Sequence, residues 1–222
     1  MTDAQPDLVA AFKALDSTCV SDALDRLGIK GTCHGILPLV SGVKAVGPAF
    51  MVKYRARGAE CGSVGDFIDD VDSGQVIVID NGGRTYCTVW GDLMTLVAGI
   101  HGIAGTVIDG VCRDVPGILR VQYPIYTRGR YMATGKDRVE FEAANVPVSI
   151  SDVGVKPGDI VVCDDSGVVV VPLQRAEEVA AVATEIDSSE RMMFELIEKG
   201  MTLREARKQV GYHTLQSRRT RE

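Results

Sequence analysis

The sequence predicts a domain of mixed α and β structure, either α/β or α+β. Short runs of β-branched residues, which are typical of buried strands, recur between residues 48 and 171. Segments with helical spacing of apolar residues collect at the beginning, in the middle and at the end of the chain. No internal repeat and no linker-like change of composition divides it, so this distribution favours one layered domain.

Composition narrows the class of protein. The chain has 222 residues, of which 45% are hydrophobic, and a formal net charge of −6. The acidic balance argues against a general nucleic-acid binder, which would present a basic face. No apolar run approaches the ~20 residues needed to cross a bilayer, and no secretory signal is evident. The six cysteines are widely spaced and form no CxxC pair, so we expect a cytoplasmic protein without a zinc site or a disulfide framework.

The first half of the chain is expected to begin with two helices, over 7–15 and 21–27, with Gly28 at the C-cap position of the second. A strand over 48–56 and a short acidic helix over 63–71 follow. The next strand, 75–80, ends at three turn residues, 81–83. This strand and turn fall short of the GxGxxG pattern, so a Rossmann-type or methyltransferase cofactor site is not favoured.

The stretch from Trp90 to Pro116 organises the chain. Apolar residues at helical spacing predict a helix over 91–101, and the β-branched run 106–108 predicts a buried strand. Arg113 and Asp114 come just past the end of that strand, where a scaffold can hold functional side chains.

Asp92 and the pair Arg113-Asp114 are separated by twenty intervening residues, about what a helix and a returning strand need to bring both ends together. The amides of a helix N-terminus form an anion site, and two carboxylates and a guanidinium beside them suit an anionic oxygen ligand held with a divalent cation. The local alternative is structural. Asp at a helix start commonly acts as a capping residue, and an exposed Arg-Asp pair contributes under about 1 kcal/mol.

The last third is expected to form strands over 124–127, 146–150 and 160–163. The turn 164–167 then leads into a hairpin partner over 168–171. A long helix over 175–199 ends at Gly200, and Thr202 begins a short helix with capping-box spacing to Glu205. Residues 213–222 are polar and basic, as expected of a frayed tail.

Several of these motifs together resemble a known family. The segments GDLM (91–94), GIAGTVIDGVCRD (102–114), SDALDRLG (21–28), GPAF (47–50), VIDNGG (78–83) and the stretch 145–172 are similar, in the same order, to the class II pyruvate aldolases. These are the 4-hydroxy-4-methyl-2-oxoglutarate / 4-carboxy-4-hydroxy-2-oxoadipate aldolases, which share a fold with the RraA-like regulators of ribonuclease E. The resemblance covers about residues 16–211. It implies an RraA-like aldolase domain there, with a helical segment over 1–15 and a tail over 212–222.

The resemblance also implies roles for particular residues. Asp114 is expected to bind a divalent metal, Mg²⁺ or Mn²⁺, and Arg113 to bind the keto oxygen of the substrate and stabilise the enolate. The amides of Gly91, Leu93 and Met94 would hold the substrate carboxylate, and Asp92 a water that serves in proton transfer. A glutamate from a neighbouring subunit assists in the family. Its place on the C-terminal helix makes Glu190 the candidate, with Glu195 behind it.

The implied fold is a layered β/β/α sandwich similar to phosphohistidine swivelling domains, assembled as a trimer or hexamer with active sites between subunits. The implied reaction is metal-dependent retro-aldol cleavage of 4-hydroxy-2-oxo acids to pyruvate, with decarboxylation of oxaloacetate as a side activity. An alternative is a non-catalytic RraA-like regulator that binds ribonuclease E or another protein. The combination of Asp92, Arg113 and Asp114 favours the enzyme, since a binding module has no need of it.

Overall fold

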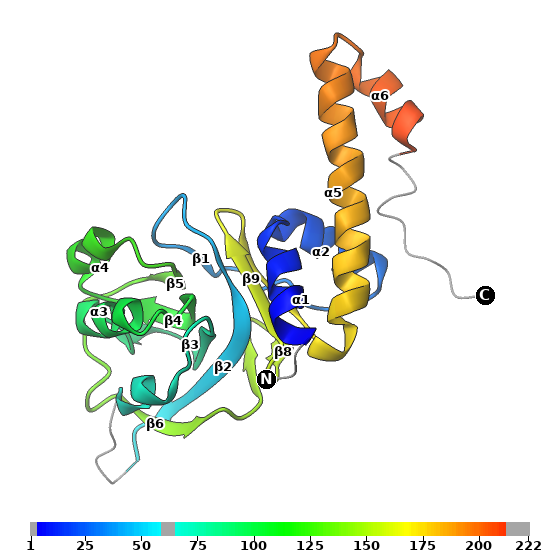
Figure 1. The fold of residues 1–222 in the computed structure, drawn as a ribbon. Helices are drawn as coiled ribbons and strands as arrows, with labels where there is room; N and C mark the ends of the chain where they lie inside the picture. The colour runs from blue at the N-terminus through cyan, green and yellow to red at the C-terminus, as the bar shows by residue number, and fades with distance from the viewer. Residues whose placement is uncertain (1–3, 59–64, 212–222) are drawn as a thin grey trace.

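A curved eight-stranded sheet organises the part of the chain that the computed structural model describes, residues 4–58 and 65–211 (Figure 1). Its strand order is β1-β5-β4-β3-β2-β9-β10, with β6 paired to β2, and β7 and β8 form a separate hairpin. The strands are β1 (Leu37–Pro38), β2 (Ala45–Ala56), β3 (Val76–Thr88), β4 (Gly105–Cys112), β5 (Ile125–Arg130), β6 (Val139–Ala144), β7 (Val148–Ile150), β8 (Val153–Val155), β9 (Ile160–Asp164) and β10 (Gly167–Val171).

The strands β2, β3, β4 and β5 run parallel, and helices make the crossovers that parallel neighbours require. A 3₁₀ helix, η1 (Asp66–Asp70), lies between β2 and β3, α3 (Asp92–Ile100) joins β3 to β4, and α4 (Val115–Val121) joins β4 to β5. Figure 1 shows α3 and α4 on the same side of the sheet. The carboxyl ends of β3 and β4 therefore lie beside the first residues of α3 and α4, the usual place for a ligand in such sheets.

Three apolar clusters show how the layers pack. The first lies between η1, α3, α4 and one face of β2 to β5, and includes Trp90 and Ile118. The second lies between the opposite face of these strands and the hairpins β7–β8 and β9–β10. The third packs the outer face of β9–β10 against α1 (Ala4–Lys13), α2 (Ser17–Arg26) and α5 (Ala176–Glu198). The layers thus run helix, sheet, sheet, helix, so a second helical layer is added to the expected β/β/α arrangement.

The helix α5 packs against the body mainly with its first half, and Glu190 just beyond the middle still contacts Cys19 of α2. Val179, Ala183 and Ile186 are buried against α1 and α2, whereas the second half projects away from the domain and carries α6 (Leu203–Val210) at its end (Figure 1). Large apolar side chains on this projecting arm are exposed: Met192, Phe194, Ile197 and Leu203. Among the described residues, no helix combines the length and the apolar character that crossing a membrane requires.

The sequence predictions for most elements are confirmed. The mixed α/β class, α3, the β9–β10 hairpin, α5 with Gly200 behind it, and the capping box of α6 are all present. The first helix begins earlier than predicted, and the second is capped by Asp16. Of the acidic helix expected over 63–71, the first two residues lie outside the described part, and residues 66–70 form the 3₁₀ helix η1.

Other predictions need correction. The chain does not turn away at residues 81–83, because β3 continues through a bulge there to Thr88, with Gly82 and Gly83 at positive φ. The strand expected over 124–127 is longer than predicted, because β5 continues to Arg130. The helix α4 and the strands β6 and β8 were not predicted. The apolar spacing that predicts α3 also does not mark its face on the core, since Thr95 and Ala98 are buried, while Leu93 and Ile100 are 76% and 74% exposed.

Candidate active site

The N-terminus of α3 forms the first part of the site. Gly91 is its N-cap residue, in an extended conformation, and no side chain of the described residues caps this end. A buried relay fixes the turn from inside: Trp90 Nε1 donates a hydrogen bond to Thr95 Oγ1 (2.9 Å), which in turn donates to the Gly91 carbonyl (2.9 Å). The first amides of the helix therefore remain available to an anion.

The turn after β4 forms the second part. Arg113 N donates to the carbonyl of Trp90 (3.0 Å), which ties this turn to the start of α3. Asp114 adopts a left-handed conformation (φ 56°, ψ 37°) as the N-cap of α4, and its Oδ2 lies 3.3 Å from Arg113 Nε. Both side chains are about two-fifths exposed. A non-glycine residue in this conformation is often found at functional sites.

Two glycines allow the carboxylates to approach these helices. A Cβ atom on Gly91 would lie 2.5 Å from Asp114 Oδ2, and a Cβ on Gly117 would lie 2.6 Å from Asp92 Cβ and 2.7 Å from its Oδ2. The structure therefore brings Asp92, Arg113 and Asp114 together beside the amides of 91–94. Neither glycine contact was predicted. The sequence does show Gly117 directly after Pro116, but its contact depends on the position of α4.

A cavity of about 330 Å³ opens beside this site. It is lined by Cys112, Arg113, Asp114, Val115, Pro116, Arg130, Tyr131 and Met132. Burial raises the pKa of the Cys112 thiol to about 11, which disfavours the reactive thiolate at neutral pH. The groups that remain for chemistry in the cavity are two guanidiniums and one carboxylate.

The donors present fit a hydrated magnesium or manganese ion better than zinc. Asp114 offers one carboxylate that is open to solvent, held where a side chain on Gly91 would collide with it. Within residues 4–58 and 65–211, no three His, Cys, Asp or Glu side chains are grouped so that they could hold a metal ion on their own, so waters and the substrate would have to complete the ligand set. Mg²⁺ keeps several waters and is often bound through one or two carboxylates together with the substrate.

Glu190 lies elsewhere in the same chain. It sits on α5, which Figure 1 shows on the opposite side of the domain from α3 and α4. Cys19 Sγ donates to its Oε2 (3.6 Å). Burial raises the pKa of Glu190, and the nearby carboxylates of Asp16, Asp22 and Asp187 raise it further, against a lowering by the Cys19 hydrogen bond. One copy of the chain therefore does not bring Glu190 to the site.

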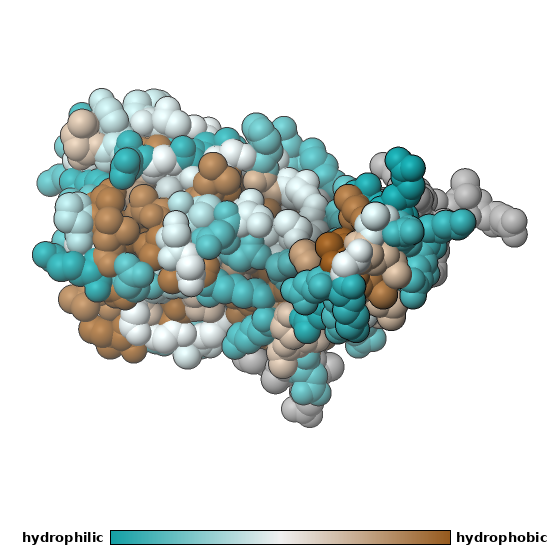
Figure 2. Space-filling model, turned by 90° about the horizontal axis from the view of Figure 1, so that it is seen from above, coloured by the Kyte–Doolittle hydropathy of each residue, from teal (hydrophilic) through white to brown (hydrophobic). Residues whose placement is uncertain are grey.

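An apolar surface covers the outside of α3 and α4. Its exposed residues are Leu93, Leu96, Ile100, Leu119 and Val121. Figure 2 shows apolar patches over the end of the molecule where Figure 1 places these helices, and another on the arm formed by α5 and α6. Large patches of this kind on a protein surface commonly mark interfaces.

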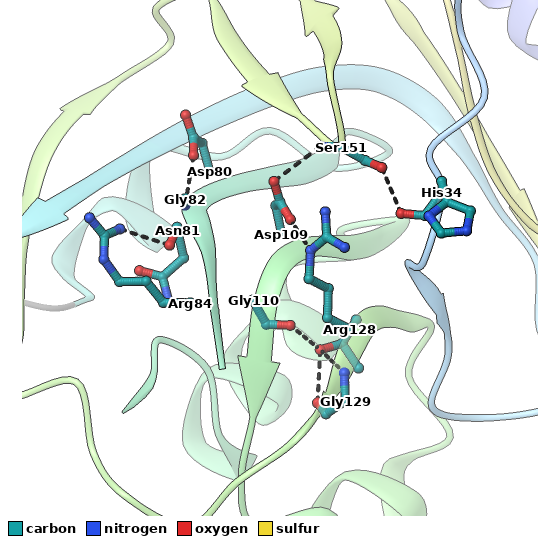
Figure 3. A network of polar contacts seen from close by, with 11 residues as sticks. His34, Asp80, Asn81, Gly82, Arg84, Asp109, Gly110, Arg128, Gly129 and Ser151 are labelled. Atoms are coloured by element: carbon teal, nitrogen blue, oxygen red, sulfur yellow. Dashed lines mark hydrogen bonds and ion pairs between the residues drawn. The ribbon is translucent and has the colours of Figure 1, made fainter. Parts of the chain in front are cut away.

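A second polar network supports β4 from the other face of the sheet (Figure 3). Asp109, which is 5% exposed, accepts hydrogen bonds from Arg128 Nε and from the backbone N–H of Ser151 (3.1 Å). Ser151 Oγ donates to the His34 carbonyl (2.6 Å). The network joins β4, β5, the β7–β8 turn and the His34 loop, and borders a polar cavity of about 610 Å³. It fixes the strand that leads to Arg113, and it was not predicted.

Comparison with known proteins identifies the family to which the chain is similar. The RraA-like model, described as Aldolase/RraA, matches residues 17–170. The chain is 36% identical over 179 residues to a Halalkalibacterium halodurans protein provisionally named 4-hydroxy-4-methyl-2-oxoglutarate aldolase, covering 81% of this chain and 83% of that protein. It is 40% identical over 214 residues to the protein DlpA of Legionella pneumophila, covering 95% of this chain. It spans only 35% of DlpA.

Solved structures agree with this placement. An uncharacterized protein from Pseudomonas syringae pv. tomato superposes with a TM-score of 0.86 at 44% identity, over 91% of this chain and 97% of that one. RraAS2 of Streptomyces coelicolor, described as an unusual member of the RNase ES inhibitor RraA protein family, superposes with a TM-score of 0.77 at 30% identity, over 86% and 98%. The resemblance seen in the sequence is confirmed, and the chain belongs to the Aldolase/RraA family.

Proposed function

We propose that this protein is a divalent-metal-dependent lyase that cleaves 4-hydroxy-2-oxo acids, of the 4-hydroxy-4-methyl-2-oxoglutarate type, to pyruvate by retro-aldol chemistry. The observation that carries the proposal is the convergence of Asp92, Arg113 and Asp114 on the uncapped N-terminus of α3. Family membership and the name of the Halalkalibacterium halodurans relative support the same reaction.

Substrate binding follows from the donors present. The amides at the start of α3, of Gly91, Leu93 and Met94, suit the carboxylate of a 2-oxo acid. Arg113, whose Nε lies beside Asp114, would donate to the keto oxygen, where negative charge develops as the C3–C4 bond breaks. A fixed positive charge at that atom stabilises the transition state more than the ground state, which is the requirement for catalysis.

Mg²⁺ or Mn²⁺ held through Asp114 would polarise the keto acid and so lower the cost of forming the enolate. Asp92 provides a carboxylate between the start of α3 and Gly117 of α4. In this proposal it would hold a water that removes the proton from the C4 hydroxyl and later delivers one to C3 of the enolate.

The remaining part of the site would come from a second copy of the chain. Burial raises the pKa of Glu190 above its ordinary value, and α5 holds this residue on the opposite side of its own domain from the site. The arm and the outside of α3 and α4 both carry exposed apolar side chains. We therefore expect a homo-oligomer, a trimer or hexamer, in which the arm of one copy reaches the site of another.

Loss of CO₂ from oxaloacetate yields the same enolate of pyruvate, so the same groups should also catalyse that decarboxylation as a side activity. Purified protein with Mg²⁺ should release pyruvate from oxaloacetate faster than Mg²⁺ alone. Equal rates would remove this part of the proposal.

A non-catalytic regulator is the second candidate. RraAS2, which belongs to a family described by inhibition of RNase ES, is 30% identical to this chain. A regulator of this kind would bind a ribonuclease equally well whether its site is intact or mutated. A pull-down with the Asp114→Ala variant would separate the two functions.

The test of the lyase is pyruvate formation from 4-hydroxy-4-methyl-2-oxoglutarate by EDTA-treated protein, with and without added Mg²⁺. Arg113→Ala should lower kcat by about 10²- to 10³-fold. Asp114→Ala should abolish the pyruvate formation that Mg²⁺ supports. Arg120→Ala and Asp70→Ala remove the same charges from exposed positions outside the site and serve as matched controls. Full activity in either site variant, or no turnover by a folded oligomer, would overturn the assignment.

A further inference from the structure

The cavity beside the active site has two walls of different origin. One wall is the turn from Cys112 to Pro116, which contains Arg113 and Asp114. The other is the end of β5 and the two residues after it, Arg130 to Met132. Cys112 pairs with Arg130 in the parallel register of β4 and β5, and Tyr131 N donates to the Cys112 carbonyl (2.9 Å). The backbone therefore holds Arg130 across the cavity from the catalytic turn.

Arg130 brings a positive charge that the protein does not neutralise. Arg113 is paired with Asp114, and Arg128, two residues before Arg130, is paired with Asp109. The side chain of Arg130 has no ion pair or hydrogen bond within residues 4–58 and 65–211. The residues that line the cavity therefore carry a net positive charge, and Arg130 supplies it in addition to the arginine expected to bind the keto oxygen.

A guanidinium of this kind matches a carboxylate. Its planar fork can donate two parallel hydrogen bonds to the two carboxylate oxygens, which a lysine cannot reproduce. The first carboxylate of a 2-oxo acid is already bound at the α3 amides in the proposed function. A second carboxylate, carried on the C4 side of the substrate, would point away from those amides and into the cavity. Its volume of about 330 Å³ is at the small end of ligand pockets, about 300–1,000 Å³, and suits a small metabolite.

The walls around Arg130 are apolar. Tyr131 and Met132 are 41% and 74% exposed, and with Val115 and Pro116 they surround the space between the two arginines. Apolar side chains beside a bound ion pair reduce its contact with water and so strengthen it. They also accept a methyl or methylene group on C4. The expected ligand is therefore a dicarboxylate with a short apolar branch.

We propose that Arg130 is a substrate-binding residue that selects 4-hydroxy-2-oxo acids with a second carboxylate on the C4 side. The inference rests on the proposed lyase function and adds to it the residue that determines the substrate class.

The test compares two inhibitors that differ in the second carboxylate. 2-Oxoglutarate carries it and pyruvate does not, and calorimetry in the presence of Mg²⁺ measures the binding of each without turnover. Arg130→Met should weaken the binding of 2-oxoglutarate by about 10- to 100-fold, the usual loss for hydrogen bonds between charged groups. The affinity of the same variant for pyruvate should change by less than about threefold. Arg130→Lys keeps the charge but not the planar fork of the guanidinium, so its affinity for 2-oxoglutarate should lie between those of the wild type and Arg130→Met.

Lys136→Met is the matched control, because Lys136 is an exposed cation in the segment after Met132 and does not line the cavity. It should leave both affinities unchanged. Equal weakening of both ligands by Arg130→Met would indicate a structural role, and no weakening of 2-oxoglutarate would show that Arg130 does not bind it. Either result overturns the inference, as does wild-type protein that binds neither ligand. Selective binding without lyase turnover would overturn the proposed function alone.

Discussion

Gly117 tests whether the close contact between α3 and α4 sets the geometry of the site. A Cβ atom at this position would lie 2.6 Å from Asp92 Cβ and 2.7 Å from Asp92 Oδ2. Carbon atoms in favourable contact are about 3.5–4.0 Å apart. Rotation of the Asp92 side chain can move its oxygen but not its Cβ, which is fixed to the first turn of α3. Gly117→Ala must therefore separate the two helices by about 1 Å.

Two energies oppose each other in this variant. Replacing glycine by alanine inside a helix stabilises it by about 0.5–1 kcal/mol. Overpacking a tight contact costs about 1–3 kcal/mol, so the net change should be a loss of stability of up to about 2 kcal/mol. The effect on catalysis should be larger, because a displacement of about 1 Å at a catalytic group can reduce kcat by about 100-fold.

The matched control is Gly99→Ala in α3. A Cβ there would meet only Val121 Cγ1, at 3.7 Å, which is ordinary contact. This variant should keep full pyruvate-forming activity and gain up to about 1 kcal/mol in urea unfolding. Gly117→Ala should lose activity and stability in the same assays. If both variants were equally active and equally stable, the contact between Asp92 and Gly117 would have no role in the geometry of the site.

Three further predictions follow from single contacts. Gly91→Ala needs no unusual backbone conformation (φ −150°), but its Cβ would lie 2.5 Å from Asp114 Oδ2, so the Mg²⁺ concentration for half-maximal turnover should rise at least about tenfold. An unchanged Mg²⁺ titration would contradict this. Because the pKa of Glu190 is raised in the folded chain, that chain binds the proton more tightly than the unfolded chain, and stability should fall as pH rises from the ordinary value of 4.5 through the raised one. Urea unfolding between pH 4 and 8 should show this fall in the wild type and its reduction in Glu190→Gln, and parallel curves would refute it. Thr202→Ala removes the capping-box hydroxyl that accepts from Glu205 N (3.4 Å) and should cost α6 about 1 kcal/mol. Hydrogen exchange should then speed up in α6 and stay unchanged in the first half of α5.

The parts of the fold that the sequence predicts well depend on local chemistry. The Asp-Asp-Ser-Gly turn at 164–167 lies between two β-branched runs and produces the β9–β10 hairpin. Thr202 and Glu205 make the reciprocal hydrogen bonds of a capping box because their three-residue spacing brings each side chain to the backbone N–H of the other residue. The helix α3 and the strand after it follow from apolar periodicity and β-branched residues.

The parts that were missed depend on distant partners or on weak local signals. The helix α4 has seven residues and contains a glycine, so apolar periodicity is too short to detect it, although Pro116 in its first turn is a typical start signal. The strand β6 exists only by pairing with β2, which is some 85 residues earlier in the chain. β3 continues past Gly82 and Gly83 because β4 supplies a pairing partner on the far side of the bulge.

The site was predictable to the extent that it follows chain spacing. A helix and a parallel strand return the chain to its starting edge, so Asp92 and the pair Arg113-Asp114 meet as expected. The contacts of Gly91 and Gly117 were not predictable, because they require the position of α4. The place of Arg130 requires the register of β5 against β4.

The exposed face of α3 links assembly to chemistry. Small residues, Thr95 and Ala98, face the sheet and let the helix lie close to it, which leaves the larger side chains of Leu93 and Ile100 outside. This face begins at Leu93, one of the residues whose amide is expected to hold the substrate carboxylate. A second copy that covered it would also remove water from the start of the helix. Because charge interactions strengthen as water is excluded, the same contact that assembles the oligomer should strengthen the binding of the substrate carboxylate and the effect of Arg113.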